Sequence, residues 1–206
     1  MTRLNVNAQK WSDKLKETLM SLCLTAYLLD LEKLESVLGA GADVPELRKQ
    51  IRQYADNQQR VFAGEDFAAS VERGASQLLA GQFADASRER LILEGFEAIC
   101  ATIGEPLDVG PFAGCHFELF EECGQTGGYL LVRGCPISRV AAASVIYHQM
   151  GYIRRSEMPQ LLAEVTAFID EAPDPVATDI MEAWEVLEEG LSKAIDQNRD
   201  IVSFQH

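Results

Sequence analysis

The sequence predicts a mainly α fold of the α+β class, a helical bundle with a small sheet supplied by the middle segment and the C-terminal tail. Three observations support this class. Apolar residues recur at three- and four-residue spacing through much of the 206-residue chain, which is the period of a helix with one buried face. The segment 107–151 is rich in glycine, so frequent turns are expected there. The tail, residues 200–206, alternates apolar and polar residues, which favours a strand.

The N-terminal part, residues 1–106, is expected to be largely helical. A first helix is predicted near Ala8–Leu19, because Trp11, Leu15 and Leu19 repeat every four residues. The short apolar stretch "SLCLTAYLL" follows. It fits either a strand or a buried extension of the helix, and periodicity does not separate the two in so short a run.

Start and stop residues delimit the other helices of this part. Aspartate is favoured at the N-cap of a helix, proline is favoured in its first turn, and glycine is favoured just after its last turn. These signals predict helices from Asp30 to Gly39, from a capping box at Asp43 and Glu46, with Pro45 in the first turn, to about Phe62, from Asp66 to Gly81, and from about Asp85 to Gly104.

The middle part, residues 107–151, is expected to supply strands. A short helix is predicted over His116–Cys123, a strand at "GYLLVRG", and either a strand or a short helix over Val140–Tyr147. The chain then returns to helices in residues 152–206. Ser156 is placed to cap the first of them, and Asp174 followed by Pro175 begins the second.

The last helix is the most regular element in the sequence. It carries one apolar stripe at three- and four-residue spacing, formed by Ile180, Trp184, Leu187 and Leu191. After it, the tail "DIVSFQH" is expected to add an edge strand to "GYLLV".

Length and composition predict a single domain over residues 1–206. Hydrophobic residues make up 47% and charged residues 24% of the chain, close to ordinary globular proteins. The N-terminus lacks the apolar core of a signal peptide, and no apolar run reaches the ~18 residues that suggest a membrane span. We therefore expect a cytoplasmic protein with no membrane partner.

Charge is the clearest anomaly of the sequence. The net charge is −14, which disfavours direct nucleic-acid binding and favours a basic protein partner. The 35 residues from Ser156 to Gly190 contain ten acids and no Lys or Arg. That segment therefore carries −10 of the −14.

The acids of the last helix are the predicted binding residues, namely Glu182, Glu185, Glu188 and Glu189. Glu182, Glu185 and Glu189 are three and four residues apart, so they share one face opposite the apolar stripe. Two interpretations stay open. The face is either a solvated surface that keeps the protein soluble or a docking surface for a cationic partner.

Metal ligation is the first chemistry that the cysteines suggest. The candidate ligands are Cys115, His116, Cys123, Cys135 and His148. Structural zinc sites bring ligands in close pairs, whereas the three cysteines here lie eight and twelve residues apart, and Cys115 and His116 are adjacent. The five cysteines of the chain also form no CxxC pair. The spacing predicts cysteines that pack as small apolar residues, with no metal and no cofactor.

Nucleophilic catalysis is the second possibility. Cys135 lies between Gly134 and Pro136, and Arg133 is two residues before it. A neighbouring cation lowers a thiol pKa, and His116 or His148 would serve as base. Nothing in the sequence places either histidine beside the thiol. No catalytic residue is assigned, and a buried cysteine in a turn is the alternative.

Three short motifs together resemble a bacterial protein family of unknown function. They are "AYLLDLEKLESVLGAG", "LLVRGCP" followed by "MGYIRRSEM", and "NRDIVSFQH". The resemblance covers nearly the whole chain from Ala26 onwards. It implies no reaction and no catalytic residue.

The leading functional hypothesis is a non-enzymatic interaction protein of the immunity or antitoxin type, which uses its acidic face to bind a basic partner. This is an analogy drawn from composition. The alternatives are an enzyme with a nucleophile at Cys135 and a metal-stabilised structural domain.

Overall fold

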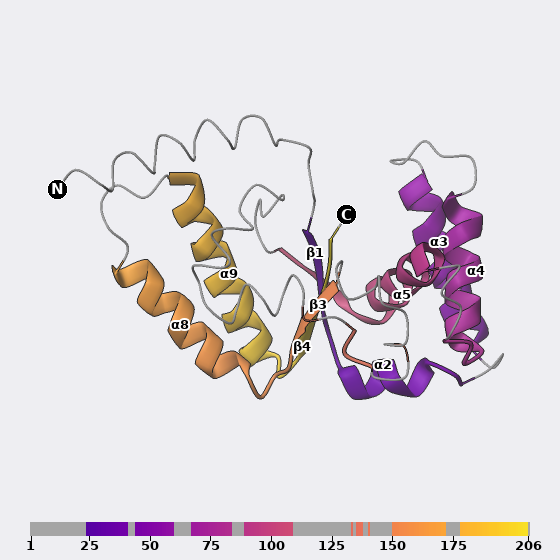
Figure 1. Ribbon diagram of the computed structural model, residues 1–206, viewed down its shortest axis with the longest axis horizontal. Helices are drawn as coiled ribbons and strands as arrows, with labels where there is room; N and C mark the ends of the chain where they lie inside the picture. The colour runs from indigo at the N-terminus through magenta and orange to yellow at the C-terminus, as the bar shows by residue number, and fades with distance from the viewer. Residues whose placement is uncertain are drawn as a thin grey trace.

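An antiparallel sheet of four strands stands between two groups of helices (Figure 1). The computed structural model describes residues 24–40, 44–59, 67–83, 89–108, 133, 135–137, 140, 150–171 and 178–205. The elements in chain order are β1 Leu24–Leu29, α2 Leu31–Val37, α3 Pro45–Gln59, α4 Phe67–Leu79, α5 Glu89–Ile103, β2 Glu105–Leu107, β3 Met150–Ile153, α8 Met158–Glu171, α9 Thr178–Asp196 and β4 Asp200–Gln205. The predicted class, mainly α with a small sheet, is confirmed.

The C-terminal strand lies inside the sheet. The strand order is β2-β1-β4-β3; Tyr27 of β1 and Tyr152 of β3 both pair with Val202 of β4. The expectation that the tail forms an edge strand on "GYLLV" is therefore wrong, because β1 and β3 occupy both edges of β4. "GYLLV" itself lies outside the described residues. The physical reason is burial: residues 200–204 are all buried, which suits a central strand.

The sheet has two covered faces. On one, Tyr27, Leu29 and Phe204 join the core formed with α2, α3, α4 and α5. On the other, Leu28 and Ile201 join the core formed with α8 and α9. Figure 1 shows α8 and α9 on one side of the strands and the other four helices opposite. The helices thus pack as two groups, because alternate side chains of β1 and β4 are apolar on both faces.

Strand β1 settles the ambiguity of "SLCLTAYLL". Residues Leu24–Leu29 form a strand, paired with β2 on one edge and β4 on the other. Periodicity alone did not distinguish strand from helix because every residue from 26 to 29 is buried, whichever face of the sheet it points to.

The cap predicted at Asp30 is confirmed. Asp30 caps α2, its Oδ1 accepting from the backbone N–H of Glu32 at 2.9 Å and of Lys33 at 3.2 Å. α3 begins at Pro45. Gly39 and Gly81, which follow α2 and α4, have φ of 77° and 76°, the left-handed conformation that glycine adopts at little cost.

The cap predicted at Ser156 is wrong. Helix α8 begins at Met158, and the cap position belongs to Glu157, whose carbonyl accepts from the backbone N–H of Leu161 at 3.2 Å. Ser156 lies inside the preceding turn, which is closed by a hydrogen bond from Glu157 N–H to the carbonyl of Arg154.

Helices α4 and α5 cross closely at a glycine that the sequence did not single out. A Cβ on Gly95 would lie 2.2 Å from the backbone nitrogen of Ala75 and 2.8 Å from the Cα of Gly74. Only a residue without a side chain permits this approach, so Gly95 sets the distance between the two helices.

Other predictions lie outside the described residues. These are the helix at Ala8–Leu19, the caps at Asp43, Asp66 and Asp174, the short helix at His116–Cys123 and, apart from the buried Val140, the element at Val140–Tyr147. Among the helices that are described, none combines the length and apolar character that crossing a membrane requires.

Candidate functional site

The predicted acidic residues lie on α9, whose opposite face is anchored in the core. Trp184, Leu187 and Leu191 are fully buried, as the apolar stripe predicted, and the Trp184 ring lies 5.0 Å from that of Phe168 on α8. Glu182, Glu185 and Glu189 are exposed. We call these three residues the acidic surface.

Glu188 does not belong to this surface. Its side chain is half-buried, and its Oε1 accepts a hydrogen bond from Thr166 Oγ1 of α8. The fourth predicted binding residue is therefore engaged between the two helices. Helical spacing places Glu188 beside the apolar stripe and Glu189 away from it, but only the position of α8 reveals the partner.

No described residue forms an ion pair with the acidic surface. The single basic residue of α9, Lys193, instead holds Glu105 of β2 at 2.6 Å between Nζ and Oε1. That contact lowers the pKa of Glu105. The side chains of Asp170 and Glu171 at the end of α8 are also exposed, so the α8–α9 layer presents carboxylates to solvent.

Cys135 is a buried thiol. Its exposure is 8%, and burial raises its pKa to about 12. Cys100 of α5 is fully buried and burial likewise raises its pKa; neither residue forms a disulfide. The thiolate is the reactive form, so this environment disfavours a nucleophile. The candidate bases His116 and His148 lie outside the described residues.

Within the described ranges, no three His, Cys, Asp or Glu side chains are grouped so as to hold a metal ion. Of the predicted ligands only Cys135 is described; Cys115, His116, Cys123 and His148 are outside. The structure therefore brings none of this set together in the part that it describes.

Arg133 joins the middle segment to the turn before α8. Its Nη1 and Nη2 donate to the two carboxylate oxygens of Glu157 at 2.6 and 2.7 Å. The guanidinium carbon also lies 4.1 Å from the centroid of the Tyr152 ring. The bidentate hydrogen bonds from Arg133 lower the pKa of Glu157. The Arg133 guanidinium thus contacts Glu157 and the Tyr152 ring, which does not support the predicted role of Arg133 in lowering the pKa of the Cys135 thiol.

Asp200 joins three distant segments. It is 4% exposed; its Oδ2 accepts from the backbone N–H of Leu31 at 3.0 Å and its Oδ1 from that of Arg155 at 2.8 Å. The Arg155 side chain in turn lies near Asp30, 3.8 Å between Nη1 and Oδ2. These residues belong to the three motifs that carry the family resemblance, so the motifs meet in space as a structural junction.

A buried polar cluster lies between β1 and the helices α3 and α5. Glu97 of α5 is 5% exposed and accepts from Thr25 Oγ1 at 2.8 Å and from Tyr27 Oη at 3.3 Å. Tyr54 Oη lies 3.5 Å from Tyr27 Oη. Burial and then the Glu97 carboxylate raise the pKa of both phenols. The hydroxyls therefore stay protonated and donate, which satisfies the buried carboxylate.

Thr25, Tyr27 and Tyr54 also line a cavity of about 370 Å³ beside β2. Sequence reasoning missed this cluster. Tyr27 appeared only as part of a motif, and nothing in the sequence relates Thr25 to Glu97, which is 72 residues away. The available signal was the presence of two glutamates, Glu94 and Glu97, in the otherwise apolar run "LILEGFEAIC".

Comparison with known proteins identifies a family but no function. A family model described as "Domain of unknown function (DUF7691)" matches residues 20–206. This confirms the resemblance to a family of unknown function. Neither the curated proteins nor the solved structures contain a match to the chain.

Proposed function

The chain belongs to DUF7691, a family of unknown function, and from that premise we propose that it is a non-enzymatic binding module that presents its acidic surface to a basic protein. The observation that carries the proposal is the exposure of Glu182, Glu185 and Glu189 on one helix, with no described cation paired to any of them. The partner we propose is a protein with a cluster of Lys or Arg side chains.

The support beneath this surface favours binding as a rigid unit. On the other face of α9, Trp184 and Leu191 pack in the core. Thr166 of α8 also donates a hydrogen bond to Glu188 of α9. A surface whose backbone is already ordered loses little entropy when a partner docks. Docking would therefore proceed without rearrangement of the two helices.

Electrostatics supply the driving force. Carboxylates three and four residues apart on a helix repel each other by roughly 0.2–0.5 kcal/mol per pair. A cationic partner relieves that repulsion and is attracted from a distance by the net charge of −14. Such attraction mainly raises association rate and selectivity, and it weakens as salt rises.

The specific form we propose is an immunity or antitoxin-like role in the bacterial cytoplasm, in which the partner is a basic toxin. It rests on the acidic composition and on the position of the acidic surface. A cysteine enzyme is the weaker alternative, because burial raises the pKa of Cys135 to about 12.

The test reverses three negative charges of the acidic surface on α9. A matched control reverses three negative charges on α2 and α3, on the other side of the sheet. The variant carries Glu182→Lys, Glu185→Lys and Glu189→Lys. The control carries Glu35→Lys, Glu46→Lys and Asp56→Lys, which are exposed positions of α2 and α3 and change the net charge equally. Each protein is used to capture partners from cells, and the captured protein is then purified and its Kd measured by calorimetry.

A basic protein bound by wild type and control, with a Kd weakened at least about a hundredfold in the acidic-surface variant, supports the proposal. This factor corresponds to about 2.7 kcal/mol. Equal Kd values for the variant and the control would refute the assignment to α9.

A further inference from the structure

The cavity of about 370 Å³ beside β2 lies between β1 and the C-terminal parts of α3 and α5. Its polar wall is formed by the hydroxyl-bearing side chains of Thr25 and Tyr27 from β1 and of Tyr54 from α3. Thr25 and Tyr54 are half-buried, and Tyr27 is 6% exposed. Sites that hold small molecules have volumes of roughly 300–1,000 Å³, so this cavity has the size of a site for a small ligand.

The hydroxyl protons of this wall are directed at a buried carboxylate. Oε1 of Glu97 accepts from Thr25 Oγ1 at 2.8 Å and from Tyr27 Oη at 3.3 Å, so these two hydroxyl oxygens are neighbours around one carboxylate oxygen. Tyr54 Oη lies 3.5 Å from Tyr27 Oη. A hydroxyl group has one proton to donate and two lone pairs that accept. Because Thr25 and Tyr27 donate their protons to Glu97, their oxygens can act only as acceptors towards a ligand.

The electrostatic environment of the wall favours a cation. Burial and then the negative charge of Glu97 raise the pKa of the Tyr27 and Tyr54 phenols, so the carboxylate acts electrostatically on both. Asp108, an exposed lining residue, adds a second carboxylate. Among the described residues that line the cavity there is no Lys or Arg. A concave site lined by one sign of charge concentrates ions of the opposite sign.

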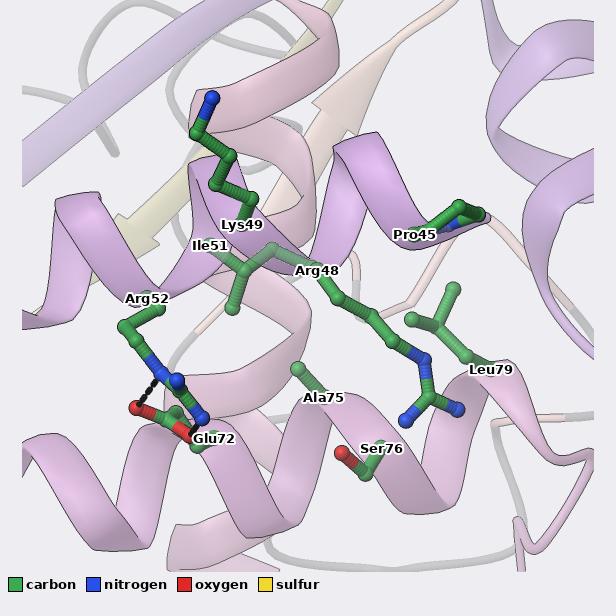
Figure 2. Close-up of a pocket in the computed structure, with 9 residues that line it drawn as sticks. All are labelled: Pro45, Arg48, Lys49, Ile51, Arg52, Glu72, Ala75, Ser76 and Leu79. Atoms are coloured by element: carbon green, nitrogen blue, oxygen red, sulfur yellow. Dashed lines mark hydrogen bonds and ion pairs between the residues drawn. The ribbon is translucent and has the colours of Figure 1, made fainter. Parts of the chain in front are cut away.

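The cationic side chains of α3 line a different hollow. Arg48, Lys49 and Arg52 belong to a groove between α3 and α4 (Figure 2). There, Arg52 Nε and Nη2 donate to the two carboxylate oxygens of Glu72, both at 2.9 Å. The basic residues of α3 therefore lie at the groove, whereas Tyr54 of the same helix lies at the cavity.

The rest of the cavity lining is largely apolar and retains accessible surface. Leu24 of β1 and Ala101 of α5 are half-buried, and Pro106 of β2 is exposed. A short alkyl group in contact with these side chains would remove apolar surface from water, which favours binding.

We propose that the cavity beside β2 binds a small primary ammonium ion. Its N–H groups donate to the hydroxyl oxygens of Thr25, Tyr27 and Tyr54, and its alkyl group lies against the apolar part of the lining. A primary ammonium has three donors and no acceptor, which complements oxygens that only accept. The Glu97 carboxylate behind the hydroxyls attracts the positive charge. The inference is independent of the proposed partner of α9, because none of these residues belongs to that helix.

Calorimetric and NMR titrations of the full chain test the ligand class. The probes are butylammonium, tetramethylammonium, butanol and butyrate. Butylammonium is expected to bind saturably and at least about tenfold tighter than the other three, a factor worth about 1.4 kcal/mol. Tetramethylammonium has the charge without an N–H donor, and butanol has a donor without the charge. No saturable binding of butylammonium, or equally tight binding of any other probe, would overturn the proposal.

A hydroxyl deletion tests the location. Tyr54→Phe removes one acceptor oxygen and is expected to weaken butylammonium binding at least about tenfold, since the lost hydrogen bond is made by a charged group. Tyr152→Phe is the matched control. Tyr152 of β3 is also half-buried and loses the same hydroxyl, but it does not line the cavity, so the Kd of this variant should equal that of wild type.

A steric variant tests the same location independently. Ala101→Leu places a larger side chain in the cavity and is expected to abolish saturable binding of butylammonium. Ala163→Leu, at an exposed position of α8, is its control, and thermal unfolding shows whether each variant is folded. A wild-type Kd in the folded Tyr54→Phe or Ala101→Leu protein, or an equal loss in a variant and its control, would overturn the assignment to this cavity.

Discussion

The carboxylate of Asp200 accepts a hydrogen bond from the backbone N–H of Leu31, which lies 169 residues earlier in the chain. The same carboxylate accepts from the backbone N–H of Arg155. The buried Asp200 carboxylate thus joins the start of β4 to the first turn of α2 and to the turn before α8. Each of the three family motifs supplies a residue to this junction.

Replacing Asp200 should destabilise the whole domain. In Asp200→Ala the N–H groups of Leu31 and Arg155 lose their acceptor, and hydrogen bonds to a charged group contribute roughly 1.5–3 kcal/mol each in net stability. We expect the free energy of unfolding in urea to fall by about 3 kcal/mol. Asp196→Ala, at an exposed position of α9, should stay within about 0.5 kcal/mol of wild type. A similar loss of unfolding free energy in both variants would contradict the stabilising role of Asp200.

Gly95→Ala and Gly190→Ala should change stability in opposite directions. A Cβ at Gly95 would lie 2.2 Å from backbone of α4, whereas at Gly190 its nearest neighbours would be 3.5 Å away. Overpacking costs roughly 1–3 kcal/mol or more, so Gly95→Ala should lower the unfolding midpoint. Alanine in a helix with space for its methyl group stabilises by up to about 1 kcal/mol, so Gly190→Ala should raise it. Thermal unfolding of the two variants distinguishes these outcomes.

The Arg133–Glu157 contact should make stability depend on pH in the acid range. The folded-state pKa of Glu157 lies below its ordinary value of 4.5. The contribution of this carboxylate is therefore fully present above pH 4.5 and is lost as the pH falls through the lower folded-state value.

Glu157→Gln removes this contribution. Urea midpoints measured from pH 7 to pH 3 should show a gap between wild type and variant that narrows below pH 4.5. Glu185→Gln is the control for loss of a carboxylate on an exposed helix face. A gap for Glu157→Gln that stays constant over the whole range would contradict the assignment of this linkage to Glu157.

Cys135 should react slowly in the folded protein. Raising its pKa from 9.0 to about 12 lowers the thiolate fraction at neutral pH about a thousandfold, and the thiolate is the attacking form. Iodoacetamide labelling, followed by mass spectrometry of the peptide that contains Cys135, should therefore be slow in buffer and fast in urea. Fast, selective labelling of Cys135 in the folded protein would instead support the alternative that the protein is an enzyme with a nucleophile at Cys135.

The successful predictions depend on short-range physics. The cap at Asp30 uses N–H groups two and three residues away, and the buried stripe of Trp184, Leu187 and Leu191 repeats within one helix. Such patterns are visible in sequence because a helix brings residues three and four apart together whatever else the chain does. The same rule grouped Glu182, Glu185 and Glu189 correctly on one exposed face.

The predictions that failed or were missing depend on distant pairs. The edge position expected for the tail required knowing that β1 and β3 both pair with β4. Glu188 was grouped with its neighbours because Thr166, 22 residues away, cannot be recognised as its partner from spacing. The cluster around Glu97 was missed for the same reason.

The sequence by itself determined the mainly α class, the helix boundaries at Asp30, Pro45 and Gly39, and the acidic character of the last helix, since each depends on residues within one or two turns. The tertiary structure alone decided that the sheet is covered on both faces, that Asp200 joins three motifs, and that Arg52 of α3 pairs with Glu72 of α4. These relationships arise when apolar faces are buried together, and burial brings into contact residues that no local pattern connects.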